Sequence, residues 1–484
     1  MGKTSLQSKA NGVVFSLQQP AWYWSLSLLL AGFYVGTSLY ISFHRPLWYD
    51  EIFTAFTSRM PNVRTIWQSL SEPVQQLPPL YFLITRIFDQ MFRHADIGIR
   101  VPSALALGTG LLITFDIARR LTDGLYGLIA MSFLTTSFVT NYGYEARPYA
   151  LYFMLAAIAL WLWVFTKDDS KTAAVAFGVV FLIGVAIHYY FLLCLAPFGI
   201  LALAERRICH PKVIAAAAGV MCSLAVLYPQ IASSYTAAHA IKGSLALPSI
   251  PRLQEVYLQL FPVAIIPLVL IATGGIAFSR SRERLVTAMN PGERVSWLFL
   301  AVPLAGYILA HLVTKVLISR YIIGAVPGIA VAVTCLFWRH CRESGRLSLA
   351  LLVLFGGFGI SQQLRTMIRI PQNLEKGTRR MLAVEDTLQR EGKRYFAVCS
   401  GILFVESWYY SKRPDLYAYV RTPGQPSFTN KYVAQNTISI EEIVAKARQT
   451  AVIAAEPAFL ETLDRAGLHL KVRFADPLYV VYLE

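Results

Sequence analysis

Acidic residues are scarce in this chain of 484 residues, where Asp and Glu number 28 against 44 Lys and Arg, for a net charge of +16. Charged residues of both signs make up only 15% of the sequence, whereas hydrophobic residues make up 55%. The mean hydropathy is +0.49. A soluble protein of this size could not cover so much apolar surface, so the composition predicts an integral membrane protein.

Cysteine is also sparse, with six residues and no CxxC pattern. Five of the six fall in expected spans or cytoplasmic loops, which leaves only Cys399 on the outer side. These counts argue against a disulfide framework and against a zinc motif. The first apolar run, 21–43, lacks a small-residue cleavage site, so we expect a retained span rather than a removed signal peptide.

The basic residues cluster in short loops between apolar runs. The clusters are Arg119-Arg120, Lys167 to Lys171, Arg206-Arg207 with Lys212, Arg280 to Arg294, and Arg339 to Arg346. This is the positive-inside pattern of membrane proteins rather than a nucleic-acid-binding surface. We therefore expect no nucleic-acid partner.

A span needs about 20 apolar residues, and eleven candidates satisfy the pattern. They are 21–43, 98–118, 124–141, 148–166, 172–187, 189–205, 212–231, 256–278, 295–315, 318–338 and 347–365. With the N-terminus inside, every basic cluster falls on the cytoplasmic side and the C-terminal region falls outside. The sequence predicts a polytopic α-helical membrane protein with about eleven transmembrane helices.

The first external loop, 44–97, carries its own helical patterns. Val63, Ile66, Trp67 and Leu70 recur at helical spacing, and an apolar stretch of about 15 residues begins at Pro78-Pro79, which is short for a span. We expect interfacial helices here. The composition changes near Ile370, which predicts a transmembrane catalytic domain over 1–366 and a small external α/β domain over 367–484.

The motif Trp48-Tyr49-Asp50-Glu51 follows the first span and places two carboxylates at a membrane boundary. A charged side chain there is energetically unfavourable, so both carboxylates are functional candidates. One interpretation is the N-terminus of a helix, where acids satisfy backbone donors. The other is catalytic, with Asp50 or Glu51 as a general base facing a membrane cavity. The pair also offers oxygen ligands for a divalent metal.

A second acidic motif, Tyr144-Glu145-Ala146-Arg147-Pro148-Tyr149, lies where the third expected span ends and the fourth begins. Glu145 and Arg147 either pair with each other at the interface or act in catalysis. In the catalytic reading, Glu145 is a second carboxylate across the cavity from Asp50, orienting an acceptor or sharing a metal ion with it. Tyr149 either belongs to an interfacial aromatic belt or stacks on a sugar.

Three further positions carry candidate binding groups. His188-Tyr189-Tyr190 lies at an external turn, where a histidine often caps the chain instead of binding substrate. Ser319-Arg320-Tyr321 opens the tenth span, where Arg320 either extends to lipid headgroups or binds a phosphate. Lys242, in the second external loop, is another candidate for phosphate binding.

Five motifs in order resemble one family: WYDE at 48–51, PPLYF at 78–82, YxxEARPYAL at 142–151, HYY at 188–190 and SRYxxxAxPG at 319–328. Together they resemble the dolichyl-phosphate-mannose–protein mannosyltransferase-like family, glycosyltransferase family 39-like, within the glycosyltransferase C superfamily. They are also similar to the lipid A aminoarabinose transferases. The resemblance covers roughly residues 20–340. The chain departs from it at Gln75-Gln76-Leu77, where many relatives carry Asp or His.

The resemblance implies transfer of a sugar from a polyprenyl-phosphate donor to an acceptor at the outer face of the membrane. The absence of outer disulfides favours a bacterial cytoplasmic membrane. The acceptor that the resemblance implies is a glycolipid, a lipopolysaccharide or a protein. Asp50 matches the family's catalytic carboxylate, Glu145 and Arg147 match its second cluster, and Arg320 and Tyr321 match the donor-phosphate region. The candidate substrate-binding residues are Tyr81, Tyr149, His188 and Tyr189.

The chemistry of the residues agrees with that implication. Such a transfer needs a base for the acceptor hydroxyl and cations for the leaving phosphate. Two alternatives stay open, namely a lipid or sugar transporter and an envelope polysaccharide polymerase or ligase. The chain lacks the inverted repeat typical of many transporters, and its large external loop comes early rather than late.

Overall fold

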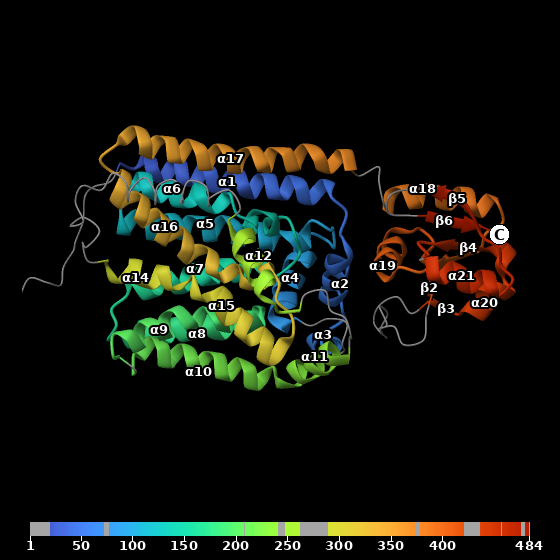
Figure 1. Ribbon diagram of the computed structural model, residues 1–484, viewed down its shortest axis with the longest axis horizontal. Helices are drawn as coiled ribbons and strands as arrows, with labels where there is room; N and C mark the ends of the chain where they lie inside the picture. The colour runs from blue at the N-terminus through green and yellow to red at the C-terminus, as the bar shows by residue number, and fades with distance from the viewer. Residues whose placement is uncertain are drawn as a thin grey trace, which may run out of the picture.

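The computed structural model describes residues 20–71, 77–207, 209–240, 247–261, 289–373, 378–420, 436–455, 457–475 and 480–483. Its helices up to Asn373 form one elongated bundle in which most helices run side by side. The strands that it describes all follow Arg394, and they form a smaller unit beyond one end of this bundle (Figure 1). The helices of the first external loop lie at that same end.

Within the described residues, five helical segments are long and apolar enough to cross a membrane, judged by length and composition. They are Trp22–His44, Gly98–Leu121, Pro291–Thr314, Ser319–Cys341 and Gly345–Ile370. Shorter apolar helices complete the bundle, and these are Gly124–Thr135, Tyr149–Phe165, Lys171–Ile187, Tyr189–Ala204 and Pro211–Val226. The chain is therefore an integral membrane protein.

Every expected span except 256–278 overlaps one of these segments. That exception falls largely on residues outside the described ranges, after α12 (Ile250–Leu260). The last segment, α17 (Gly345–Asn373), continues past the boundary expected at residue 366. In Figure 1 it runs alongside α1 (Trp22–His44).

Several bundle helices end early and continue as tight turns. Helix α6 (Gly124–Thr135) gives way to the 3-10 turn η2 (Phe138–Gly143), and α8 (Lys171–Ile187) to η3 (Tyr189–Cys194). A third turn, η6 (Ser319–Ala325), precedes α16 (Val326–Cys341). Irregular backbone at membrane depth is tolerated where protein or a cavity surrounds it. Turn η3 carries Tyr189, and η6 carries Arg320 and Tyr321.

The first external loop contains α2 (Tyr49–Ser58), α3 (Val63–Ser69) and α4 (Pro79–Met91). Pro79 occupies the first turn of α4, where its missing N–H costs no helical hydrogen bond. Helix α4 has only 13 residues and buries Tyr81 and Phe82 against the bundle. It is thus a short helix of the loop, as its sequence predicts.

The C-terminal unit is built around a six-stranded sheet. Its strands are β1 (Tyr395–Val398), β2 (Tyr417–Val420), β3 (Thr437–Ile438), β4 (Thr450–Ile453), β5 (Lys471–Ala475) and β6 (Val480–Leu483). They lie in the order β3-β2-β1-β4-β6-β5; the pairings among the first four strands are parallel, and β6 pairs antiparallel with both β4 and β5. Its helices are α18 (Thr378–Arg390), α19 (Gly401–Tyr410), α20 (Ile440–Ala445) and α21 (Pro457–Arg465).

This C-terminal unit shares a core with the first external loop. Ile52 and Phe53 of α2 are fully or almost fully buried in one cluster with Phe396 of β1 and Phe404 of α19. A shared apolar cluster is expected to hold the two parts together. The helix that carries Asp50 therefore packs between the bundle and the C-terminal unit.

Candidate active site

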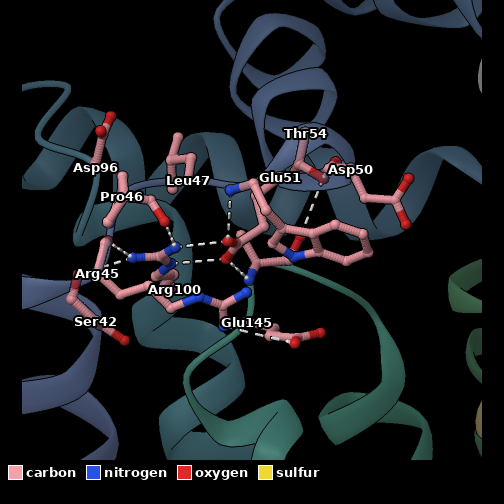
Figure 2. A network of polar contacts seen from close by, with 12 residues as sticks. Ser42, Arg45, Pro46, Leu47, Asp50, Glu51, Thr54, Asp96, Arg100 and Glu145 are labelled. Carbon is pink, nitrogen blue, oxygen red and sulfur yellow. Dashed lines mark hydrogen bonds and ion pairs between the residues drawn. The ribbon is translucent and has the colours of Figure 1, made fainter. Parts of the chain in front are cut away.

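The candidate site begins at the N-terminus of α2, where the chain turns away from α1. Trp48 is extended and precedes the helix, and its backbone N–H donates to Glu51 Oε2 at 3.3 Å. Asp50 and Glu51 thus lie in the first helical turn, where carboxylates are favoured by the helix dipole. Successive helical residues point about 100° apart, so the two carboxylates face different surroundings (Figure 2).

Glu51 faces the protein interior and pairs with Arg100. Arg100 Nε donates to Glu51 Oε1 at 2.7 Å and Arg100 Nη2 to Oε2 at 2.5 Å, and neither side chain is exposed. Glu51 Oε1 also accepts the N–H of Ala146 at 2.7 Å. Burial alone would raise the pKa of Glu51, but the ion pair with Arg100 holds it below its ordinary value.

Arg100 also joins the segment before α2 to the bundle. Its guanidinium donates to the carbonyl oxygens of Ser42 at 2.8 Å, Arg45 at 2.6 Å and Pro46 at 3.0 Å (Figure 2). The interpretation in which Glu51, rather than Asp50, is the general base facing a cavity therefore does not fit this arrangement. Both of its oxygens are engaged by backbone and Arg100, so Glu51 holds α2 in place instead.

Asp50 has the opposite environment, with a side chain that is 21% exposed and flanked by two arginines. Its Oδ2 lies 3.5 Å from Arg147 Nη2 and 3.8 Å from Arg320 Nη1. Arg147 Nη1 also donates to the backbone carbonyl of Asp50 at 3.3 Å. One partly exposed carboxylate thus meets two guanidinium groups that come from distant parts of the sequence.

Glu145 and Arg147 do not pair through their side chains, contrary to one interpretation of their motif. Arg147 contacts Asp50, whereas Glu145 Oε1 lies 3.6 Å from Arg45 Nη1. Burial raises the pKa of Glu145 to about 7, although Arg45 lowers it in part. The segment from Glu145 to Arg147 is neither helix nor strand, so the short spacing of the motif did not imply a contact between the two side chains.

His188 is buried at the break between α8 and η3, and it caps the chain there as one interpretation predicts. Its Nδ1 accepts the N–H of Tyr190 at 3.3 Å. Burial, with Arg147 and Arg320 nearby, lowers the pKa of His188 to about 3, so the ring is neutral and its proton lies on Nε2. That buried Nε2 meets no hydrogen-bond partner among the described residues.

Aromatic rings connect His188 to the arginines. The His188 ring lies 5.5 Å from that of Tyr149 and 5.3 Å from that of Tyr321. The Arg320 guanidinium lies 5.7 Å from the centre of the Tyr149 ring and 5.8 Å from that of Tyr321, as in cation–π contacts. Arg320, Tyr321, Tyr149 and His188 therefore form one cluster beside Asp50.

An apolar cavity of about 260 Å³ opens next to this cluster. Its wall includes His188, Tyr189 and Tyr321, and most of the remaining lining is aliphatic, with Leu309 and Val313 as examples. Tyr190 fixes the wall, because its hydroxyl bonds Thr314 Oγ1 at 2.6 Å and the carbonyl of Val316 at 2.9 Å. The cavity thus has a largely apolar interior, and one of its lining residues, Tyr321, contacts Arg320.

Two other candidates are placed differently. Tyr81 is fully buried under the site, and burial raises the pKa of its hydroxyl, although Thr85 and the nearby charge of Arg147 offset part of that rise. Lys242, together with Gln75 and Gln76, falls outside the described residues.

The described residues do not offer a metal site, because they contain no group of three or more His, Cys, Asp or Glu side chains that could hold an ion. Asp50 and Glu145, the expected ligands, face arginines instead. The metal expected from these two carboxylates therefore finds no fitting donor set here.

The fold and site define a polytopic membrane protein with a carboxylate–arginine site at the end of its helical bundle that faces the C-terminal sheet. Residues 76–232 match a family model described as dolichyl-phosphate-mannose-protein mannosyltransferase. This range contains three of the five motifs, but neither Asp50 nor Arg320. Over these residues the match confirms the resemblance to the dolichyl-phosphate-mannose–protein mannosyltransferase-like family.

Solved structures extend the likeness over almost the whole chain. ArnT from Cupriavidus metallidurans bound to undecaprenyl phosphate has a TM-score of 0.63 at 12% identity. The same protein in its apo state has a TM-score of 0.64, also at 12% identity. Each match covers 96% of this chain and 98% of the other. No curated protein sequence matches significantly. At this identity the likeness shows the fold.

Proposed function

We propose that this chain is an inverting glycosyltransferase that moves a sugar from a polyprenyl-phosphate donor to an acceptor at the outer face of a bacterial cytoplasmic membrane. The observation that carries the proposal is Asp50, a single partly exposed carboxylate between Arg147 and Arg320. The family match and the fold shared with ArnT, a protein whose structure contains undecaprenyl phosphate, support it.

The reaction assigns one role to each charge. Asp50 accepts the proton of an acceptor hydroxyl, whose oxygen attacks the anomeric carbon from the face opposite the phosphate. The bond between that carbon and the phosphate oxygen breaks, and the polyprenyl phosphate leaves as an anion beside Arg147 and Arg320. Attack from the opposite face inverts the anomeric centre.

The contacts of Asp50 with the two arginines are loose enough for the arginines to release Asp50 and bind a donor phosphate instead. The distances from Asp50 to the two arginines, 3.5 and 3.8 Å, are longer than close hydrogen-bonded ion pairs. A donor phosphate is therefore expected to take over the guanidinium groups and leave Asp50 free to act on the acceptor. Planar guanidinium groups bind phosphate oxygens two at a time.

The cavity supplies a place for the lipid part of the donor. Its aliphatic lining suits the first isoprene units of a polyprenyl chain, and its rim lies beside Arg320 and Tyr321. The Nε2–H of His188 is a buried donor without a partner in the described part of the chain, so it is available to an oxygen of the phosphate or sugar. The acceptor is a glycolipid, a lipopolysaccharide or a protein.

The test is transfer of radiolabelled sugar by the purified chain in liposomes. A panel of polyprenyl-phosphate sugars is supplied together with envelope extract. We expect labelled acceptor and free polyprenyl phosphate in equal amounts, because each transfer breaks one sugar–phosphate bond. Movement of intact donor across the bilayer without cleavage of that bond would instead support a transporter.

A further inference from the structure

The backbone N–H groups around the start of α2 find partners in the C-terminal unit. The N–H of Tyr49 donates to Glu406 Oε1 of α19 at 3.2 Å, and the N–H of Leu47 donates to the Tyr410 hydroxyl at 2.6 Å. Tyr49 is the first residue of α2, and the first N–H groups of a helix have no partner within it. A side chain more than 350 positions away in sequence therefore caps the helix that carries Asp50.

The same segment is held from its other side by the bundle. Arg100 binds the carbonyls of Arg45 and Pro46, and Glu51 binds Arg100 (Figure 2). The start of α2 thus lies between Arg100 on the bundle side and α19 on the side of the C-terminal sheet. Asp50 directly follows Tyr49, whose backbone N–H donates to Glu406.

We propose that α19 is a positioning element for catalysis, in which Glu406 and Tyr410 fix the start of α2 so that Asp50 stays beside Arg147 and Arg320. This inference rests on the proposed function, and it adds a role for the C-terminal unit. The effect of Glu406 and Tyr410 passes through two backbone N–H groups, and a small displacement of a catalytic group is costly.

The other end of the interface provides a matched control. Tyr409, next to Tyr410, donates to Asp96 Oδ1 at 2.8 Å and accepts from Arg59 Nη1 at 2.8 Å. Arg59 follows the last residue of α2, so this contact lies at the end of the helix remote from Asp50. The Tyr410 hydroxyl also donates to Asp96 Oδ2 at 3.1 Å. Tyr409→Phe and Tyr410→Phe therefore each remove one hydroxyl bond to Asp96, but only Tyr410→Phe removes a contact with the start of α2.

The experiment measures kcat and KM for the donor with the full chain in liposomes. Glu406→Ala and Tyr410→Phe are each expected to lower kcat by about tenfold to a hundredfold, with KM for the donor unchanged, because the base is displaced and donor binding is not. Glu406→Gln keeps an acceptor oxygen and is expected to restore most of kcat. Tyr409→Phe is expected to stay within about twofold of wild type.

Hydrogen exchange separates this inference from the proposed function. Amide exchange at Leu47 and Tyr49 is expected to speed up in Glu406→Ala and Tyr410→Phe but not in Tyr409→Phe. If the wild type transfers no sugar, the proposed function fails. Faster exchange in only those two variants would still support the inference that Glu406 and Tyr410 fix the start of α2. Unchanged exchange, unchanged kcat, or an equal loss in all three variants would overturn the inference.

Discussion

The buried pair of Glu51 and Arg100 gives the sharpest stability prediction. Both side chains have no exposed surface, and each also satisfies backbone groups, so removal of one partner leaves a buried charge without compensation. Such a loss costs about 3–5 kcal/mol, whereas an exposed pair contributes about 0–1 kcal/mol. We therefore expect Glu51→Met and Arg100→Met each to lower the free energy of unfolding by about 3–5 kcal/mol.

The double variant is the critical measurement. With both charges gone, no uncompensated charge is buried, so Glu51→Met with Arg100→Met is expected to lose much less than the sum of the two single variants. Unfolding in mixed detergent micelles, followed by circular dichroism, provides the free energies. Additive losses, or single losses below about 1 kcal/mol, would refute the reasoning.

The pair also predicts a dependence on pH. The pKa of Glu51 in the folded protein lies below its ordinary value of 4.5, so the Glu51 carboxylate binds a proton less readily in the folded state than in the unfolded state. The stabilising contribution is therefore present above about pH 4.5 and is lost as the pH falls through the lower, folded-state pKa. Glu51→Met is expected to lack this part of the acid sensitivity.

Three further predictions concern the donor site, and each is tested by measuring KM for the polyprenyl-phosphate sugar donor. Arg320→Lys keeps the charge but loses the planar guanidinium. It is expected to raise KM about tenfold, because one charged hydrogen bond contributes about 1.5–3 kcal/mol. An unchanged KM would exclude Arg320 from the phosphate site. His188→Phe keeps a ring but removes the Nε2–H, so KM is expected to rise while the pH dependence stays unchanged. Glu145 titrates near pH 7, so KM is expected to rise as the pH rises through about 7, when its negative charge appears near Arg147 and Arg320. Glu145→Gln is expected to abolish that rise, and a rise that persists would assign the titration to another group.

Much of the site was predictable because its motifs sit at span boundaries. Asp50, Arg147 and Arg320 are charged residues at or near the ends of apolar runs, where charge is costly and therefore informative. Sequence reasoning did not predict which of them meet, because the contacts of Asp50 with Arg147 and Arg320 join elements far apart in the chain.

Two residues were misjudged or missed for physical reasons. The motif groups Glu51 with Asp50 as a base, although adjacent positions on a helix face different directions; Glu51 faces Arg100, whereas Asp50 faces Arg147 and Arg320. Arg100 was missed, although it lies within an expected span and a charge there is itself a signal. The contact of α19 with the start of α2 left no local pattern, since Glu406 and Tyr410 accept there from the backbone N–H groups of Tyr49 and Leu47, which carry no sequence signal.

The most direct test of the account is sugar transfer by Asp50→Asn compared with wild type, using a polyprenyl-phosphate sugar that wild type accepts. The amide keeps the size of the side chain but removes the base, so transfer is expected to fall at least about a hundredfold, with unchanged folding by circular dichroism and an unchanged free energy of unfolding. Transfer that survives in a well-folded Asp50→Asn would contradict the assignment of Asp50 as the base.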